Sequence, residues 1–257
     1  MERNLKIFTG KIIYTLVVCV FLLALWQVCI WIFNPPKYLF PTPLAVAETF
    51  LQQPNYLISN MLITLQEMVL GFIVGSVSGI LVALLLSQFK IVDRYLMPLV
   101  VVTQTLPVFA IAPLLVIWFG FGIGSKIVMA SLIIFFPVAS AFYDGLKSTS
   151  LTWLDLAKSW RMSKFQTLLY FRIPAALPSL MTGLKVAATI APIGAIVGEW
   201  AGAAGGLGFV MLQANARTQT ATVFASLVLL GLSAWGLRWI VVQLADHYVW
   251  WSATKVS

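Results

Sequence analysis

Few residue types in this 257-residue sequence could do chemistry. Its one histidine, His247, cannot build a His-rich metal site, and the sequence holds no G-x-x-x-x-G-K-[ST], H-E-x-x-H or G-x-S-x-G motif. Gly120, Gly122 and Gly124 form a glycine-rich run, but no strand precedes it, so we expect a turn instead of a nucleotide site. The sequence therefore predicts no catalytic residue, no metal site and no cofactor bound by this chain.

Two carboxylates, Glu67 and Glu199, stand within or near long apolar stretches. An acid at membrane depth is costly and is for that reason a functional candidate. Each of the two also lies near one end of its stretch, where a role at the membrane interface explains it equally well. Both interpretations stay open from the residues alone.

The composition indicates that most of this protein lies in lipid. Hydrophobic residues make up 61% of the chain and charged residues 9%, whereas soluble domains carry about 25% charged residues. This excludes a soluble globular enzyme. A membrane-spanning helix needs about 20 apolar residues. We therefore expect an all-α integral membrane protein, a single transmembrane domain over 1–257 with about six spans at 12–33, 61–87, 95–119, 127–143, 175–200 and 221–242.

The distribution of Lys and Arg predicts the orientation of these spans. The first stretch follows a basic start, but it is too long for a signal peptide and lacks an A-x-A site, so we expect a retained span. An even number of spans puts both termini on one side of the membrane. Most Lys and Arg lie on that side, including those of the 144–174 loop, and this excess predicts that the side is cytoplasmic. Lys37, Lys126 and Arg217 fall on the other side. The net charge of +8 therefore needs no nucleic-acid partner.

The longest hydrophilic segment is the loop between the fourth and fifth predicted spans, residues 144–174. Apolar residues recur in it at helical spacings of three and four, for example at Leu151, Leu154 and Ala157, and predict short amphipathic helices. Trp153 and the basic residues also favour a helix that lies on membrane lipid. Lipid contact and a protein partner are equally good explanations at this point.

Small residues and prolines indicate how the spans pack and bend. Gly71, Gly75 and Gly79 stand four residues apart in the second predicted span, a pattern that lets two helix backbones approach closely. A proline within a span removes one backbone donor and can bend its helix. Broken helices at membrane depth occur where they line a cavity or pack on protein. The sequence therefore allows bends at Pro98, Pro107, Pro113, Pro137 and Pro192.

Residues 155–178, DLAKSWRMSKFQTLLYFRIPAALP, resemble the EAA loop of permease subunits of binding-protein-dependent ABC importers, whose pattern is E-A-A, three residues, G, nine residues, I-x-L-P. Asp155 takes the Glu position, and Pro174 takes the closing Pro at the same spacing. Arg161 stands where the pattern has Gly, a residue that permits a tight turn between two short helices. The resemblance implies an ATPase-coupling loop with the residues Asp155, Ala157, Arg161, Met162, Ser163 and Pro174.

Two further stretches are similar to a narrower group of permeases. PVFAIAPLLVIWFGFGIGSK (107–126) and GEWAGAAGGLGFVMLQANARTQT (198–220) look like permeases for nitrate, taurine, alkanesulfonates, riboflavin and thiamine pyrimidine precursors, and 215–220 is most similar to the last subgroup. The resemblance implies a type I ABC importer permease fold in a bacterial cytoplasmic membrane. It also implies three partners: a cytosolic ATPase dimer that binds ATP and Mg²⁺, an extracytoplasmic solute-binding protein and a second copy of this chain.

The candidate pathway residues are polar or aromatic side chains at membrane depth. Three consecutive polar residues occupy the middle of the third predicted span, with an aromatic residue about one turn later, and a Glu-Trp pair precedes a glycine-rich turn. An aromatic and amide environment would suit a flat heterocycle. Hydrogen bonds between helices and an interfacial turn are the alternatives. The candidates are Thr103, Gln104, Thr105, Phe109, Glu199 and Trp200.

Three functions remain to be compared. The first is an importer permease for a small solute such as a thiamine pyrimidine precursor, and the second is the same machine with a sulfonate, taurine or nitrate as its solute. The third is an ion-coupled secondary transporter, which would need a midplane acid relay or paired repeats. Neither is evident in the sequence, so we expect the importer permease, with ATP hydrolysis in a separate subunit.

Overall fold

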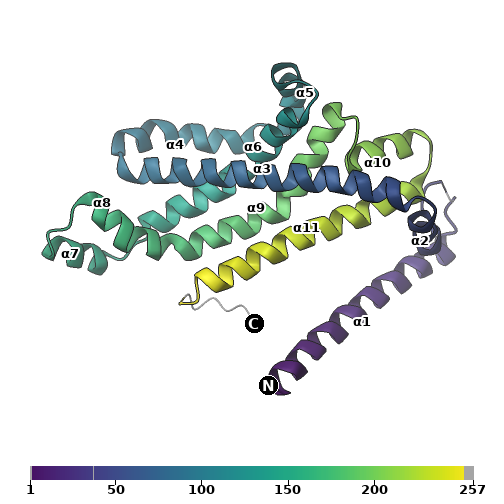
Figure 1. The fold of residues 1–257 in the computed structure, drawn as a ribbon, viewed down its shortest axis with the longest axis horizontal. Helices are drawn as coiled ribbons and strands as arrows, with labels where there is room; N and C mark the ends of the chain where they lie inside the picture. Colours follow the sequence, from purple (N-terminus) through teal and green to yellow (C-terminus); the bar gives the residue numbers. More distant parts are fainter. Residues whose placement is uncertain (1, 37, 252–257) are drawn as a thin grey trace.

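The computed structural model describes residues 2–36 and 38–251, the side chains of 2–16 and 19 excepted. Every regular element in these residues is a helix (Figure 1). In chain order the helices are α1 Glu2–Phe33, α2 Pro43–Gln52, α3 Pro54–Gln88, α4 Lys90–Thr105, α5 Val108–Phe119, α6 Ile123–Lys147, α7 Leu151–Ser159, α8 Lys164–Thr167, the π-helical turn η1 Leu168–Arg172, α9 Ile173–Gly202, α10 Leu207–Ala216 and α11 Thr220–Tyr248.

Four of the described helices are long and apolar enough to cross a membrane. They are α3, α6, α11 and the continuous helix Lys164–Gly202 that α8, η1 and α9 form together. The first predicted span, 12–33, lies within α1, whose segment Val20–Phe33 is a shorter apolar helix. The side chains of 12–16 and 19 lie outside the described part of that span. An all-helical membrane bundle is confirmed.

The third predicted span, 95–119, is not a single helix. α4 ends at Thr105, α5 begins at Val108, and the two helices are bent by 101°. Pro107 explains the break because it lacks a backbone N–H and moves the residue before it out of the helical region. Leu106 accordingly has the extended angles φ −72° and ψ 121°. The continuous span is therefore corrected to a broken pair of helices.

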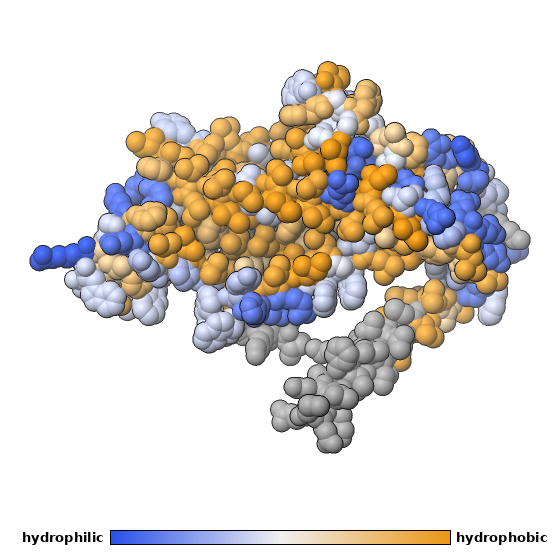
Figure 2. Space-filling model, viewed as in Figure 1, coloured by the Kyte–Doolittle hydropathy of each residue, from blue (hydrophilic) through white to orange (hydrophobic). Residues whose placement is uncertain are grey.

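The surface of the bundle is apolar where a membrane would surround it. Figure 2 shows hydrophobic residues over the middle of the molecule and hydrophilic residues concentrated toward its two ends. Large apolar side chains stand exposed along the spans, for example Val77, Leu81 and Trp235. Such a surface would be unfavourable in water but matches lipid tails.

Helix α6 packs between α3 and α9, and glycines bring the three backbones together. Gly71, Gly75 and Gly79 of α3 face α6, and glycines of α9 face it as well. A Cβ added at Gly75 would stand 2.9 Å from the Cβ of Ile134, closer than real side chains approach. The glycine ridge of α3 is therefore a site of close helix contact.

A buried ion pair joins α6 to α3. Lys126, in the first turn of α6, is 7% exposed, and its Nζ lies 3.1 Å from Oε1 of Glu67, which is 1% exposed. The other carboxylate oxygen of Glu67 is buried without a hydrogen-bond partner among the described residues. The Lys/Arg count assigned Lys126 to an outer loop; the structure instead places it inside the bundle, where its charge meets an acid.

Glu199 of α9 holds the start of α10. Its Oε2 accepts hydrogen bonds from the N–H of Gly208 and, at 3.3 Å, from the N–H of Phe209, and its Oε1 accepts one from the Thr64 hydroxyl at 2.6 Å. Thr64 Oγ1 in turn accepts from the N–H of Leu207 at 2.7 Å. A carboxylate at a helix N-terminus satisfies donors that have no partner within the helix. α3, α9 and α10 are thus joined by buried hydrogen bonds.

Gly206 makes this approach of the carboxylate possible. Its φ is +106°, and a Cβ at this position would overlap the carboxylate of Glu199. Its N–H donates to Oδ1 of Asn60 in α3 at 2.8 Å. Only glycine combines this backbone conformation with the absence of a side chain. The glycine-rich turn is therefore shaped around Glu199.

We predict that Gly75→Ala destabilises the bundle, because the added methyl group meets Ile134. Overpacking of a tight contact costs about 1–3 kcal/mol, which should lower the melting temperature of the detergent-purified protein by several degrees. The control is Gly231→Ala, where no atom lies within 4 Å of an added Cβ. Equal melting temperatures for the two variants would contradict the packing role of Gly75.

A second prediction concerns the buried charges. Lys126→Met leaves Glu67 without its cation, and breaking a buried ion pair by removing one partner costs about 3–5 kcal/mol. The matched control, Lys147→Met, breaks an ion pair at the other end of α6 whose lysine is 54% exposed, a class worth about 0–1 kcal/mol. Adding Glu67→Gln to Lys126→Met should recover part of the lost melting temperature. A single Lys126→Met variant as stable as the control would refute this account.

Candidate functional site

The hydrophilic segment 148–172 forms an elbow that consists of α7, α8, η1 and the turns around them. α7 and α8 project from one end of the bundle, and α2 and α10 lie toward the opposite end (Figure 1). The elbow runs into α9 without a break, so that Lys164–Gly202 is a continuous helix of 39 residues. The loop expected at 144–174 thus contains two short helices, although α6 extends to Lys147 and Pro174 already lies in α9.

Arg161, the residue after the C-cap of α7, has a left-handed conformation, with φ +54°. The N–H of Arg161 donates to the carbonyl of Lys158 at 2.9 Å, and that of Met162 donates to the carbonyl of Ala157 at 3.0 Å. These are the two hydrogen bonds of a Schellman motif. Glycine is favoured at this position because residues with a side chain pay about 1–2 kcal/mol there. Arg161 therefore makes the turn expected for the Gly of the EAA pattern.

Ser163 begins the second short helix. Its Oγ accepts a hydrogen bond from the N–H of Gln166 at 3.2 Å, and the Gln166 side chain accepts one from the N–H of Ser163 at 2.8 Å. This reciprocal pair is a capping box. Met162 stands between the end of one helix and the cap of the next and is half-buried. The backbone of Arg161, Met162 and Ser163 is therefore held in one geometry.

The elbow has a packed face and an exposed face. Ala157 is 1% exposed, and the Phe171 ring lies 5.9 Å from that of Trp153, centroid to centroid. Asp155 is exposed and pairs with Lys158 at 2.8 Å. Such a surface ion pair is worth about 0–1 kcal/mol, so a partner's charge could replace it. The exposed face also presents four large apolar side chains, Leu151, Trp153, Trp160 and Phe165.

A three-residue cluster joins the elbow end of α6 to the start of α4. Asp93 accepts a hydrogen bond from the Tyr143 hydroxyl and forms an ion pair with Lys147, Nζ to Oδ2 2.9 Å. Lys147 also lies 4.3 Å above the centre of the Tyr143 ring. This cluster was not predicted, because Asp93 is distant from Tyr143 and Lys147 along the chain. The spacing of four between Tyr143 and Lys147, which puts both on one helix face, was the available signal.

The structure brings four of the six candidate pathway residues together at the break between α4 and α5. Thr103, Gln104 and Thr105 form the last turn of α4, and Phe109 lies in the first turn of α5. The two threonine hydroxyls donate to backbone carbonyls three residues earlier, at 2.6 Å and 2.9 Å. Gln104, Thr105 and Phe109 are exposed, so the break presents polar and aromatic groups on the outside of the single chain.

The other two candidates, Glu199 and Trp200, lie at the end of α9 and hold the turn into α10. Glu199 is 1% exposed and caps α10. The indole N–H of Trp200 donates to the carbonyl of Gly208 at 3.2 Å. In this conformation both side chains therefore hold the turn into α10, and Glu199 also binds Thr64 of α3. A gating role would require these hydrogen bonds to break.

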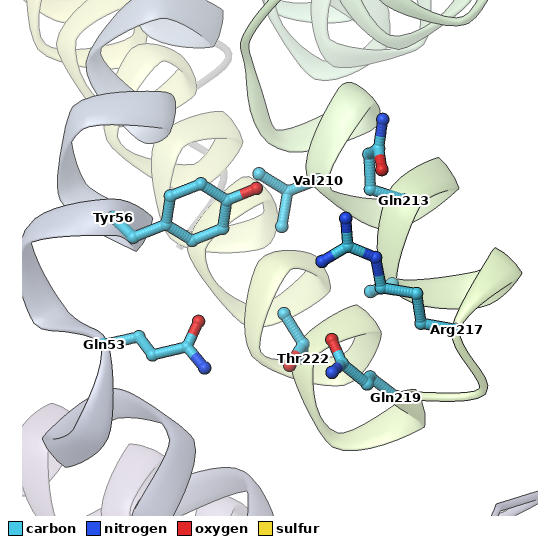
Figure 3. A pocket seen from close by; sticks show the side chains of 8 residues that line it. Gln53, Tyr56, Val210, Gln213, Arg217, Gln219 and Thr222 are labelled. Atoms are coloured by element: carbon cyan, nitrogen blue, oxygen red, sulfur yellow. The ribbon is translucent and has the colours of Figure 1, made fainter.

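A polar pocket of about 260 Å³ lies where α3 begins and α10 ends. Figure 3 shows Gln53 and Tyr56 on one side of it and Gln213, Arg217 and Gln219 on the other. Amides and a guanidinium can bind polar or anionic groups. This region was indicated beforehand by the resemblance of 198–220 and, at Arg217, by the distribution of Lys and Arg. No group of three or more His, Cys, Asp or Glu side chains that could hold a metal ion occurs among the described residues.

Comparison with known proteins identifies the family to which these features belong. Residues 71–249 match the family described as "Binding-protein-dependent transport system inner membrane component". A Haemophilus influenzae protein named "Probable ABC transporter permease protein" is 45% identical over 229 residues, which cover 89% of this chain and 94% of that protein. The formylaminopyrimidine transport permease protein ThiX of Halalkalibacterium halodurans is 36% identical over 212 residues, which cover 82% and 84%.

A solved structure has the same fold. A chain of the methionine ABC transporter MetNI, crystallised in an inward-facing conformation, matches 75% of this chain and 96% of its own length with a TM-score of 0.66 at 18% identity. The expected type I importer permease fold is confirmed, and nothing in these comparisons supports an ion-coupled secondary transporter. The chain therefore belongs to the inner membrane components of binding-protein-dependent transport systems and is the permease subunit of an ABC importer.

Proposed function

We propose that two copies of this permease form one importer, with a cytosolic ATPase dimer bound to the elbows and an extracytoplasmic binding protein docked at the opposite end. Permeases of this family generally work with an ATPase and a solute-binding protein, which supports both partners. The elbow end and both termini lie in the cytoplasm of a bacterium, because Lys and Arg concentrate on that side. The solute is a small heterocycle of the thiamine pyrimidine-precursor class.

The exposed face of the elbow is the observation that carries the ATPase partner. Leu151 is 76% exposed and Phe165 69%, although both stand in the most hydrophilic segment of the chain. Exposed apolar groups rimmed by charges are typical of protein interfaces. The Schellman turn at Arg161 and the cap at Ser163 hold this face in a fixed shape, so it can bind as one body.

Two connections lead from the elbow into the bundle. The first is Lys164–Gly202, 39 residues long, or about 58 Å at the ~1.5 Å rise of an α-helix. The second is the contact of Asp93 with Tyr143 and Lys147, which links the elbow end of α6 to α4. Closure of the ATPase dimer would move both connections, and ATP would bias the bundle between inward-open and outward-open states.

The break between α4 and α5 supports a second copy and a solute path. Non-helical backbone at membrane depth is tolerated when protein covers it or when it lines a water-filled cavity, but not against lipid. Gln104 and Phe109 are exposed at this break in the single chain. A second copy facing the break, with an aqueous path between the two chains, satisfies this requirement.

The side chains at the break suit a neutral heterocycle. Gln104 can both donate and accept hydrogen bonds, and Phe109 offers a ring face for stacking. The similarity to a formylaminopyrimidine permease supports the same class. A sulfonate, taurine or nitrate is the alternative solute. An anion would favour a cationic group, and none of Thr103, Gln104, Thr105 and Phe109 is charged.

We predict that Arg161→Glu uncouples transport while the permease stays folded. Glu tolerates the left-handed turn about as well as Arg does, but it brings a like or unpaired charge into the interface, which costs several kcal/mol. We expect at least a tenfold loss of solute-stimulated ATP hydrolysis when the permease, its ATPase and its binding protein are reconstituted in liposomes.

The control for this prediction is Arg161→Gly, which removes the charge but favours the turn. It should melt at the same or a higher temperature than the original permease and should keep coupled ATP hydrolysis. Retention of full uptake and stimulated hydrolysis by Arg161→Glu would place Arg161 outside the interface. Failure of any ATPase to co-purify with the permease would refute the proposed assembly.

A further prediction concerns the solute. Gln104→Leu keeps the size of the side chain but removes its hydrogen bonds, each worth about 0.5–1.5 kcal/mol, so uptake of formylaminopyrimidine should fall by about threefold to tenfold. The exposed residue Gln243 of α11 provides the control variant Gln243→Leu, with uptake expected to be unchanged. Uptake of radiolabelled solutes into liposomes measures both. Uptake of taurine but not of the pyrimidine would support the alternative solute instead.

A further inference from the structure

A cavity of about 840 Å³ lies between the corner that joins α3 to α4 and the elbow. Both elements line it, with side chains that include Phe89, Lys90, Lys158, Met162, Lys164 and Arg172. Of the elbow residues assigned to the ATPase contact, Met162 lines the cavity, whereas Asp155 and Arg161 do not. The proposed ATPase contact therefore reaches this cavity at Met162 and leaves its basic wall without a role.

The wall of the cavity is basic. Four cations line it, and no acidic side chain does so among the described residues. Lys158 already has an ion-pair partner in Asp155. Lys90, Lys164 and Arg172 form no ion pair within the part of the chain that the structure describes. Their positive charge is therefore available to an anion from outside the chain.

The same cavity has an apolar side. Phe89 and Ile91 line it from the α3–α4 corner while remaining 57% and 75% exposed, and Leu154 and Met162 line it from the elbow. The corner is the point at which α3 ends and α4 begins, so the cavity lies at the ends of these two apolar helices. Nearby Trp153 is exposed, as tryptophans at membrane interfaces commonly are. A basic and an apolar wall side by side match an amphiphile with an anionic head.

We propose that this cavity binds an anionic phospholipid, with its phosphate between Lys90, Lys164 and Arg172 and its acyl chains along Phe89 and Ile91. Basic pockets between membrane helices on the cytoplasmic side bind anionic lipid headgroups. The placement in the cytoplasmic leaflet rests on the proposed function. A lipid bound there joins the α3–α4 corner to the elbow, so the charge of the surrounding lipid regulates how firmly the elbow is held during coupling.

The test is lipid retention by the purified full-length permease, measured by native mass spectrometry after incubation with equal amounts of phosphatidylglycerol and phosphatidylcholine. The original permease should retain phosphatidylglycerol preferentially. The cavity variant Lys90→Gln/Arg172→Gln should retain about tenfold less of it, because each cation near the headgroup adds to the affinity. The control variant, Arg94→Gln/Arg238→Gln, removes the same charge from exposed positions that do not line the cavity and should retain the lipid normally.

A charge-preserving variant, Lys90→Arg/Arg172→Lys, separates charge from folding and should keep the preference for phosphatidylglycerol. Equal losses in the cavity and control variants would overturn the proposal. Displacement of the lipid by millimolar inorganic phosphate would overturn it as well, because the site would then bind a free anion. Displacement by the purified ATPase subunit would assign the cavity to the ATPase interface, which also contradicts it.

Retention is measured without the ATPase and without uptake, so its outcome is independent of the proposed function. A permease that supports ATP-driven uptake but shows no preference for phosphatidylglycerol would refute the lipid site alone. In liposomes, replacement of phosphatidylglycerol by phosphatidylcholine should lower the stimulated ATP hydrolysis of the original importer. The same replacement should leave the hydrolysis of the cavity variant unchanged.

Discussion

The charged and polar groups buried in this bundle constrain how its helices meet. Lys126, Glu67 and Glu199 are almost fully buried, and a buried charge is costly unless it is paired or hydrogen-bonded, so each side chain needs a partner within the protein. Lys126 has to face α3, and Glu199 has to meet the free N–H groups of α10. Apolar packing alone is compatible with several rotations of a helix about its axis. The contacts of Lys126 and Glu199 require the rotation that points these side chains at their partners. The close glycine contacts of α3 with α6 then complete the arrangement.

In this arrangement the helix Lys164–Gly202 is held by buried hydrogen bonds near Gly202, and its other end belongs to the elbow. Near Gly202 the Glu199 network ties it to α3 and α10, while at Lys164 it continues into the elbow outside the apolar belt. The elbow can move as one rigid body only if the turn between α7 and α8 keeps its geometry. The left-handed turn at Arg161 and the cap at Ser163 supply that stiffness, and the turn geometry persists although Arg is a costly residue for it.

The chemistry changes along the length of the molecule. At the elbow, cations and aromatic side chains suit both a protein partner and an anionic lipid, and of the residues assigned to the ATPase contact Met162 also lines the proposed lipid cavity. At the α4–α5 break the exposed candidate side chains are neutral, as at Gln104 and Phe109. Where α3 begins and α10 ends, amides and the guanidinium of Arg217 line a small polar pocket.

The sequence by itself determined the membrane class, most of the long helices and the elbow, because apolar length and helical spacing are properties of neighbouring residues. The EAA spacing placed Arg161 at the position of the pattern's Gly, but only the structure showed that Arg161 adopts the left-handed conformation there. Only the tertiary structure decided that Lys126 is buried against Glu67, that Asp93 holds Lys147, and that the third span bends by 101°. Each of the two ion pairs joins residues that are far apart in the chain, so only the packing of the helices brings the partners together. A proline permits a bend but does not set its angle, which the packing also determines.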